Sequence, residues 1–312
     1  MEICIVGLGS IGTRHLTNLS MILSNRKVTY AIDALRSSDS PLPDEVACMI
    51  REEYYNPDDL PNVYDIIIIS NPTVSHYTSL RSMIPKAQHI FIEKPIFDNA
   101  DYKLRDLRLK QGGIYYVACP LRHHSVVRYL KTFIESNSVY SVRAICSSYL
   151  PEWRPGTDYR KCYSAIADMG GGVRLDLIHE WDYLWYLFGE PVRVQETHGT
   201  FSNLGISSDD VAVYIADYPD KLVSLHLDYF GRFARREIEL YTENDVLVGD
   251  LIARNIRSLQ SKQVVDLPQG QNDIYIAEMS GFLDMTEGNA YNYNDIDTAM
   301  KVLSMATGKK QS

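Results

Sequence analysis

Residues 3–12 of this 312-residue chain read Ile-Cys-Ile-Val-Gly-Leu-Gly-Ser-Ile-Gly. Four apolar residues predict a buried strand, and the six that follow match the pattern G-x-G-x-x-G. In that pattern the first glycine permits a tight turn, the second lets backbone approach a pyrophosphate, and the third lets a helix pack closely on the strand. The N-terminus of that helix offers unpaired N–H groups to phosphates. We therefore expect a dinucleotide to contact Gly7, Gly9, Ser10, Ile11 and Gly12.

Around this turn, short apolar runs alternate with amphipathic stretches as far as about residue 120. The predicted strands are Ile3–Val6, Val28–Ile32, Ile66–Ile69, Ile90–Ile92 and Tyr115–Ala118. Helices are predicted between several of them, including Ile11–Leu23 and Tyr102–Lys110. Because nearly continuous apolar strands alternate with helices, residues 1–120 are predicted to form an α/β Rossmann domain with a doubly wound parallel sheet.

The pattern changes after residue 120. The predicted elements are a helix near residues 124–135, a strand Val139–Tyr149 and an apolar helix Val173–Phe188 that ends before Gly189 and Pro191. Alternating apolar residues between 192 and 266 predict antiparallel strands with one covered face. Two helical patterns, near residues 272–287 and 294–306, follow. Residues 121–312 are therefore predicted to form an α+β domain with an open, mostly antiparallel sheet.

The composition narrows the class of protein. With 31 basic and 40 acidic residues, the net charge is −9, which argues against nucleic acid or an anionic membrane as the main partner. The longest aliphatic run, Ile66–Ile69, is far shorter than the ~20 residues of a membrane-spanning helix. The five cysteines form no C-x-x-C pair, which favours reduced thiols over disulfides or a zinc site. We expect a cytoplasmic protein without a metal site.

Asp33 lies 21 residues after Gly12, at the expected end of the second strand. A carboxylate there can accept hydrogen bonds from the adenosine ribose and would repel a 2′-phosphate, which favours NAD. Arg36 follows closely and could neutralise a 2′-phosphate, so NADP remains the alternative. A helix-capping aspartate is the purely structural explanation.

Two further polar segments directly follow predicted strands, and in open α/β sheets ligands bind outside the carboxyl ends of the strands. Ser70-Asn71-Pro72-Thr73 follows the third strand, and Glu93-Lys94-Pro95 follows the fourth. A Glu-Lys pair at this position belongs either to a ligand-binding site or to a strand end that is exposed to solvent. Neither segment decides between these alternatives alone.

A third segment is the glycine run 170–172 and the helix after it, on which Asp176, His179 and Asp182 recur every three residues. Side chains three apart share one face of a helix, so this polar stripe faces either water or a site. A helix with one wetted edge and a structural histidine is the alternative explanation. The stripe lacks the H-E-x-x-H spacing and any cysteine, which argues against a metal.

In order and spacing, these motifs together with His76 resemble those of the Gfo/Idh/MocA oxidoreductases over essentially the whole chain. The resemblance implies a Rossmann domain followed by a domain whose open sheet often forms dimers or tetramers. It implies hydride transfer between NAD(P) and a hydroxyl-bearing carbon of a sugar, sugar acid, nucleotide sugar or cyclitol. The alternatives left open are an NAD-dependent glycosidase and a non-catalytic dinucleotide-binding sensor.

The resemblance also implies residue roles. Lys94 corresponds to the lysine of the family's Glu-Lys-Pro element, which contacts the nicotinamide ribose and the substrate hydroxyl. His179 corresponds to the family's general acid/base, with Asp176 as a supporting carboxylate. Many members place that aspartate four residues before the histidine, whereas here it is three. The remaining implied cofactor contacts are Asn71, Pro72, Thr73, His76 and Glu93.

The segment 149–160, Tyr-Leu-Pro-Glu-Trp-Arg-Pro-Gly-Thr-Asp-Tyr-Arg, is similar to a subgroup linked to surface-polysaccharide or nonulosonic-sugar pathways. Trp153 can stack on a sugar face, and arginines can hold a carboxylate or phosphate with two hydrogen bonds. A surface loop with a packed tryptophan is the alternative. The predicted substrate-binding residues are Arg122, Trp153, Arg154, Tyr159, Arg160 and Asp182, with His123 and His124 as further candidates to line the site.

Overall fold

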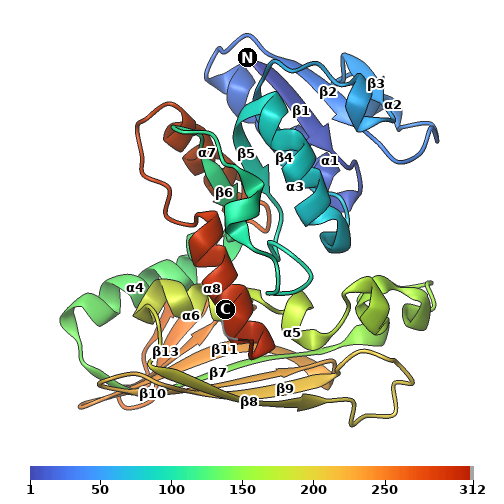
Figure 1. Ribbon diagram of the computed structural model, residues 1–312. Helices are drawn as coiled ribbons and strands as arrows, with labels where there is room; N and C mark the ends of the chain where they lie inside the picture. Colours follow the sequence, from blue (N-terminus) through green and yellow to red (C-terminus); the bar gives the residue numbers. More distant parts are fainter. Residues whose placement is uncertain (310–312) are drawn as a thin grey trace. The chain divides into compact units, whose positions relative to one another are not determined.

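The computed structural model describes residues 1–309, which form two compact units (Figure 1). The first unit contains Met1–Ala118 and Asn272–Lys301, and the second contains Cys119–Gln271 and residues 302–309. The sequence-based division at residue 120 placed residues 272–301 in the second domain, whereas the structure groups them with the first unit. Each unit is described separately below.

The first unit is built on six parallel strands in the order β3-β2-β1-β4-β5-β6. The strands are β1 Glu2–Val6, β2 Ala31–Leu35, β3 Glu52–Tyr54, β4 Tyr64–Ile69, β5 Ala87–Ile92 and β6 Tyr115–Val117. This is the strand order of the dinucleotide-binding doubly wound fold. The apolar runs of β1, β4 and β5 are buried almost completely. The predicted α/β class and parallel sheet are confirmed.

The main helices of this unit are α1 Ser10–Asn25, α3 His76–Met83 and α7 Asp273–Thr286, with a single turn at α2 Asp44–Ala47. Helix α7 belongs here because it is tied to α1 by polar contacts. The Asn18 and Asn272 side chains exchange hydrogen bonds, and Arg26 forms an ion pair with Asp284 at 2.7 Å. The polar contacts therefore pair two helices that are more than 240 residues apart in the sequence.

Two local predictions in the first unit are wrong. The helix expected over Tyr102–Lys110 is only a 3₁₀ turn, Leu104–Leu107, followed by a left-handed residue at Arg108. Only Leu107 of the turn is buried, which is too little apolar burial to stabilise a helix of that length. The second strand is Ala31–Leu35 rather than Val28–Ile32, because β1 pairs Glu2 with Ala31 and Val6 with Leu35.

The second unit contains an eight-stranded sheet in the order β14-β13-β12-β11-β7-β10-β9-β8. Its strands are β7 Val139–Tyr149, β8 Arg193–Gly199, β9 Val211–Asp217, β10 Leu222–Asp228, β11 Phe230–Thr242, β12 Val246–Asp250, β13 Asn255–Ser258 and β14 Val264–Asp266. All pairings are antiparallel except that of β7 with β10. The predicted α+β class and mostly antiparallel sheet are confirmed.

Helices α4 Ser125–Ser136 and α6 His179–Phe188 lie over one face of this sheet (Figure 1). The single helix predicted over Val173–Phe188 is instead two, because α5 Val173–Asp176 ends before Leu177 and α6 begins at His179. The last helix is α8 Ile296–Thr307, whose first residues belong to the first unit and whose last belong to the second.

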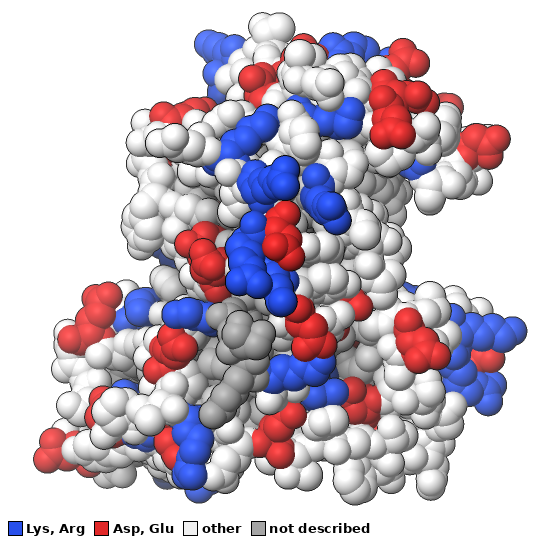
Figure 2. Space-filling view, viewed as in Figure 1, with Lys and Arg blue, Asp and Glu red and all other residues white. Residues whose placement is uncertain are grey.

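Lys and Arg side chains are interspersed with Asp and Glu on the molecular face drawn in Figure 2. Within residues 1–309, no helix combines the length and the apolar character needed to cross a bilayer. All five cysteines lie in this part of the chain, and none of them forms a disulfide.

Candidate active site

The glycine turn between β1 and α1 has one open side. Gly7 has a φ of +92°, and a Cβ there would lie 2.8 Å from the Asn71 backbone. A Cβ on Gly12 would lie 2.0 Å from the Gly7 carbonyl oxygen. By contrast, a Cβ on Gly9 would meet nothing within 4 Å, and Gly9 is the N-cap of α1. The turn therefore leaves space for a ligand in front of the first N–H groups of the helix, as pyrophosphate binding requires.

Asp33 does not lie where the predicted ribose contact needs it. It sits in the middle of β2, opposite Cys4, and is 0% exposed. Arg51 donates to its two carboxylate oxygens at 2.9 and 2.7 Å, and the Tyr64 hydroxyl donates at 2.8 Å. The carboxylate is thus enclosed and already hydrogen-bonded, so as placed here it has no surface left for a ribose.

Arg36 is the first residue after β2. Its guanidinium forms an ion pair with Glu53 and donates to the Ser40 carbonyl oxygen at 2.6 Å. Ser37 and Ser38, which follow, are exposed. The carboxyl end of β2 therefore carries the Arg36–Glu53 ion pair and two exposed hydroxyl groups rather than the predicted Asp33 carboxylate.

The segment after β4 is held in place by His76, which is 1% exposed. Its Nε2 lies 2.9 Å from the Asn71 carbonyl oxygen and its Nδ1 lies 2.9 Å from that of Pro95. Burial lowers the pKa of His76 below its ordinary value, although these carbonyl groups oppose the shift. His76 therefore links two of the predicted cofactor-binding segments and does not itself present a surface to a cofactor.

Asn71 offers a different kind of group. Its side-chain amide donates to the Ser79 hydroxyl at 2.7 Å. Its Oδ1 is buried and, within the described chain, has no hydrogen-bond partner. Pro72 is exposed and Thr73 partly so. An unpaired buried oxygen beside the glycine turn suits a ligand that brings a hydrogen-bond donor.

Glu93 follows β5 and is turned inward, with 8% of its surface exposed. One carboxylate oxygen lies 2.6 Å from His15 Nε2, and the other accepts from the backbone N–H of Lys94 at 3.0 Å. Burial acts to raise the pKa of Glu93, but the His15 hydrogen bond and the charges of His15 and Lys94 outweigh it and keep the pKa low. Both oxygens are occupied, so this geometry does not support the predicted direct contact with the cofactor. The Lys94–Pro95 peptide is cis.

In the second unit, Asp176 and Trp153 come together through a residue that the sequence did not indicate. Asp176 is 9% exposed and accepts from the Tyr229 hydroxyl at 2.6 Å. The Trp153 ring packs edge-on against the Tyr229 ring, with centroids 5.2 Å apart, and its Nε1 donates to the Ser148 hydroxyl. Trp153 is 37% exposed, so it presents a ring that is both fixed and accessible.

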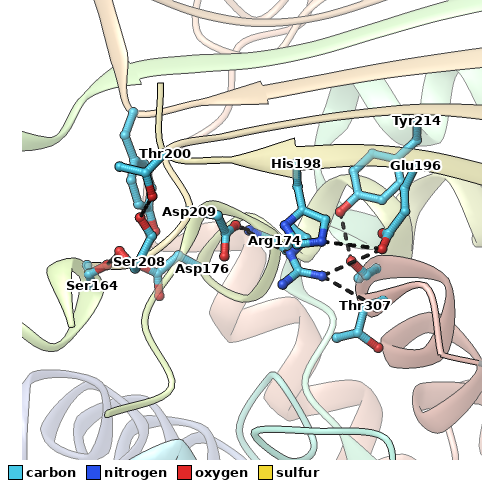
Figure 3. Close-up of polar contacts among 12 residues, drawn as sticks. Ser164, Arg174, Asp176, Glu196, His198, Thr200, Ser208, Asp209, Tyr214 and Thr307 are labelled. Atoms are coloured by element: carbon cyan, nitrogen blue, oxygen red, sulfur yellow. Dashed lines mark hydrogen bonds and ion pairs between the residues drawn. The ribbon is translucent and has the colours of Figure 1, made fainter. Parts of the chain in front are cut away.

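Helix α5, which carries Asp176, is anchored by Arg174 (Figure 3). The Arg174 guanidinium lies 3.4 Å from Asp209 and 3.7 Å from Glu196, and it donates to the Thr307 carbonyl oxygen. Burial raises the pKa of Glu196 in spite of Arg174. These contacts, with that between Asp176 and Tyr229, fix the first helical turn separately and explain why the predicted helix is broken.

Several predicted substrate-binding residues are committed to other partners. Arg122 and Asp182 form a buried, two-bond ion pair at 3.1 and 2.7 Å, with 5% and 7% of their surfaces exposed. Arg160 pairs with Asp158 at the surface, and Tyr159 donates to the Leu204 carbonyl oxygen. Arg154 remains exposed and lies over the Tyr163 ring at 5.4 Å. Of this predicted set, Trp153 and Arg154 are exposed, and Tyr159 is partly exposed.

His123 and His124 were further candidates to line the site. Burial, together with nearby arginines, lowers the pKa of each to about 4. His124 is 7% exposed, and its Nδ1 accepts from the Val126 N–H as the N-cap of α4. His124 therefore has a structural role here. Within residues 1–309, no group of three or more His, Cys, Asp or Glu residues could hold a metal ion.

Comparison with protein families agrees with this architecture. A family model described as "Oxidoreductase family, NAD-binding Rossmann fold" matches residues 1–111, and the GFO/IDH/MocA C-terminal domain matches residues 127–248. Together they cover well over half of the sequence. The chain belongs to the GFO/IDH/MocA oxidoreductase family, and its first unit is the NAD-binding Rossmann domain of that family.

Two curated proteins are similar over part of their length. The myo-inositol 2-dehydrogenase of Thermotoga maritima is 27% identical over 200 residues, which cover 62% of this chain and 56% of that protein. The uncharacterized oxidoreductase YrbE of Bacillus subtilis is 26% identical over 196 residues, covering 60% of this chain and 54% of that protein. The match thus spans little more than half the length of either relative.

Solved structures share the fold over nearly the whole chain. Levoglucosan dehydrogenase in complex with NADH and levoglucosan has a TM-score of 0.82 at 16% identity, covering 98% of this chain and 95% of that one. UDP-N-acetylglucosamine 3-dehydrogenase GnnA from Acidithiobacillus ferrooxidans has a TM-score of 0.75 at 18% identity, covering 99% and 96%. At these identities the likeness concerns the fold alone.

Proposed function

We propose that this chain is an NAD(P)-dependent oxidoreductase that transfers a hydride between the nicotinamide and a hydroxyl-bearing carbon of a sugar, sugar acid, nucleotide sugar or cyclitol. The observation that carries the proposal is the glycine turn, whose open side at Gly9 faces the uncapped start of α1. The unpaired Asn71 oxygen beside it suits a ligand donor. When bound, the nicotinamide supplies the hydride chemistry, and the chain supplies orientation and proton transfer.

We assign charge stabilisation to Lys94 and proton transfer to His179. The Lys94 ammonium would stabilise the negative charge that develops on the substrate oxygen. The His179 imidazole would take up or release the hydroxyl proton, because the ordinary pKa of histidine, about 6.5, is close to cellular pH. Asp176 is proposed as the supporting carboxylate, held in one orientation by Tyr229.

The proposed substrate class rests on the loop that follows β7. Trp153 offers an accessible ring whose orientation is fixed by Tyr229 and Ser148, which suits stacking on a sugar. Arg154 is an exposed cation and can attract an acidic group on that sugar. Arg122 and Asp182 are assigned no direct substrate contact, since both are buried and pair with each other, whereas Arg160 pairs with Asp158 at the surface and stays a proposed contact.

The choice between NAD and NADP depends on the end of β2. Asp33 is enclosed, so the reason to prefer NAD loses its physical basis. Arg36, with the exposed hydroxyls of Ser37 and Ser38, provides the kind of groups that bind a 2′-phosphate. We therefore propose that NADP binds at least as well as NAD. We expect the dissociation constant of NADPH in wild type to be no higher than that of NADH, and to rise above it in Arg36→Ala.

The experiment that tests the function measures reduction of NAD and NADP spectrophotometrically against uronates, nonulosonates, nucleotide sugars and inositols. Lys94→Ala and His179→Ala are expected to lower turnover by about 100-fold or more while cofactor affinity changes little. Unchanged turnover in either variant removes that residue from the mechanism. Sugar release without net reduction of the cofactor would indicate a glycosidase, and binding without turnover on any compound would indicate a sensor.

We also propose that the chain forms a homodimer or homotetramer through the sheet face of the second unit opposite α4 and α6. Partly exposed apolar side chains on the strands, such as Val213 and Leu222, support this choice. Light scattering would measure the mass in solution, and a monomer at micromolar concentration would contradict it. The absence of disulfides among the five described cysteines suits a reducing compartment, and we assign the protein to the cytoplasm.

A further inference from the structure

A buried polar contact in the first unit joins α1 to the end of β5. His15 is 0% exposed and Glu93 is 8% exposed, and their side chains meet at 2.6 Å. The two residues are 78 positions apart. The imidazole also packs edge-on against Phe91 of β5, with centroids 4.9 Å apart. The contact is therefore a fixed part of the packing between this helix and this strand.

The same carboxylate continues to the backbone of Lys94. Glu93 Oε1 faces His15, and Glu93 Oε2 accepts from the Lys94 N–H at 3.0 Å. The Glu93 N–H in turn donates to the Ile69 carbonyl oxygen, which fixes the main chain of this residue against β4. A rigid path of hydrogen bonds thus leads from α1 to the peptide that carries Lys94.

The location of this path gives it a functional meaning. His15 lies three residues after Gly12, on the helix whose N-terminus closes the glycine turn. Lys94 directly follows Glu93. The path connects the element that would receive the pyrophosphate with the element that carries the proposed catalytic ammonium. Fixing the relative position of two such elements matters because a displacement of about 1 Å at a reacting group can lower a rate by about 100-fold.

We propose that His15 and Glu93 are positioning residues that hold Lys94 in its working orientation relative to the cofactor-binding turn. Neither side chain is assigned a contact with cofactor or substrate, because both are buried against each other and His15 also packs against Phe91. The inference rests on the function proposed above, since it presupposes that Lys94 takes part in the reaction.

Two matched pairs of variants test the proposal. His15→Gln keeps an amide nitrogen near the position of Nε2, whereas His15→Leu keeps bulk and removes the donor. Glu93→Gln keeps an oxygen that can accept from the Lys94 N–H, whereas Glu93→Ala removes it. We expect kcat to fall by about 10-fold or more in His15→Leu and Glu93→Ala, with the dissociation constant of NADPH or NADH changed by less than about 3-fold. The two glutamine variants should recover most of kcat.

A second measurement reports on the positioning without any substrate. The amide of Lys94 should exchange its hydrogen faster in His15→Leu and Glu93→Ala than in wild type, because its acceptor is mobile or absent. Leu23→Ala is the control, since this residue is also 0% exposed and lies two turns further along α1. It should lose stability while retaining kcat and the exchange rate of Lys94.

The outcomes separate this inference from the proposed function. If Lys94→Ala leaves turnover unchanged, the role of Lys94 fails, and the exchange measurement still decides whether His15 and Glu93 hold its backbone. If Lys94→Ala abolishes turnover but His15→Leu and Glu93→Ala behave like Leu23→Ala, the positioning role is overturned. His15→Leu leaves a buried carboxylate unpaired and can fail to fold. If His15→Leu does not fold, Glu93→Ala, which removes that carboxylate, decides whether the positioning role holds.

Discussion

Replacing Asp33 by asparagine distinguishes two possible roles of this residue, a contact with the cofactor ribose and a structural contact inside the protein. If Asp33 bound the ribose, the change would mainly weaken NAD binding. In the structure the carboxylate is 0% exposed and receives three hydrogen bonds, two from Arg51 and one from Tyr64. The change should therefore act on stability and leave cofactor selectivity as it was.

The size of the effect follows from these contacts. Asparagine retains one acceptor oxygen but loses the charge and the second acceptor. A hydrogen bond to a charged group contributes about 1.5–3 kcal/mol. The Arg51 side chain is 46% exposed, so water can replace part of its lost hydrogen bonding to Asp33. The loss of stability therefore stays below the 3–5 kcal/mol typical of breaking a fully buried ion pair. We expect the free energy of unfolding to fall by about 2 kcal/mol.

Urea unfolding and calorimetric titration with NADH and NADPH provide the two readouts. The ratio of the two dissociation constants should stay within about 2-fold of wild type, since no group at the ribose changes. Loss of a real ribose contact to a carboxylate would instead cost about 1.5–3 kcal/mol, or roughly 10- to 100-fold in NADH affinity. An NADH-specific loss of that size with unaltered stability would refute the assignment of Asp33 to the protein interior.

Four other substitutions test separate parts of the account. Gly9→Ala should leave the free energy of unfolding unchanged, because the added Cβ meets nothing within 4 Å. It should weaken dinucleotide binding, measured by calorimetry, about 10-fold because the Cβ fills the open side of the turn. Gly12→Ala should lose both binding and stability, because its Cβ would lie 2.0 Å from a carbonyl oxygen. Arg122→Leu leaves the buried Asp182 carboxylate unpaired and should lower the free energy of unfolding in urea by about 3–5 kcal/mol; a loss under about 1 kcal/mol would contradict the burial of the pair. Burial and two neighbouring arginines lower the pKa of His123 from 6.5 to about 4. Between these pH values the unfolded chain binds a proton that the folded chain does not. The free energy of unfolding should therefore decrease as the pH falls through this range, by at most about 3 kcal/mol from this group. His123→Gln should flatten that part of the stability profile, and an unchanged slope would show that the histidine titrates normally.

The sequence predicted those elements whose signal is local. The apolar runs in β1, β4 and β5 and the strand Val139–Tyr149 all lie within their predicted positions, because burial on both faces or strict alternation marks each segment by itself. The glycine turn was also predictable, since Gly7 and Gly12 have geometric requirements that no other residue meets.

The position of β2 could not be predicted in the same way. Val28, Thr29 and Tyr30 have high strand propensity, yet the strand begins at Ala31 because its pairing with β1 fixes the register. A shift of three residues moves Asp33 from the end of the strand to its middle. For this reason the Asp33 carboxylate lies inside the sheet, and Arg36 is the residue that follows the strand end.

Parts of the candidate site depend on contacts over long sequence separations. Tyr229 reaches Asp176 across 53 residues and His15 reaches Glu93 across 78 residues. The sequence around a tyrosine or histidine in an apolar stretch does not indicate which distant residue it will contact. For the same reason Arg122 and Asp182 were predicted to bind substrate, although in the fold they neutralise each other.

Deuterium transfer tests the central claim most directly. A substrate identified in the sugar panel would be deuterated at its hydroxyl-bearing carbon and incubated with the protein and NADP or NAD. We expect the label to appear at C4 of the reduced nicotinamide, one atom per substrate oxidised, and to appear about 100-fold more slowly with Lys94→Ala. Reduced cofactor that carries no deuterium, or label that accumulates equally fast in the variant, would contradict the account.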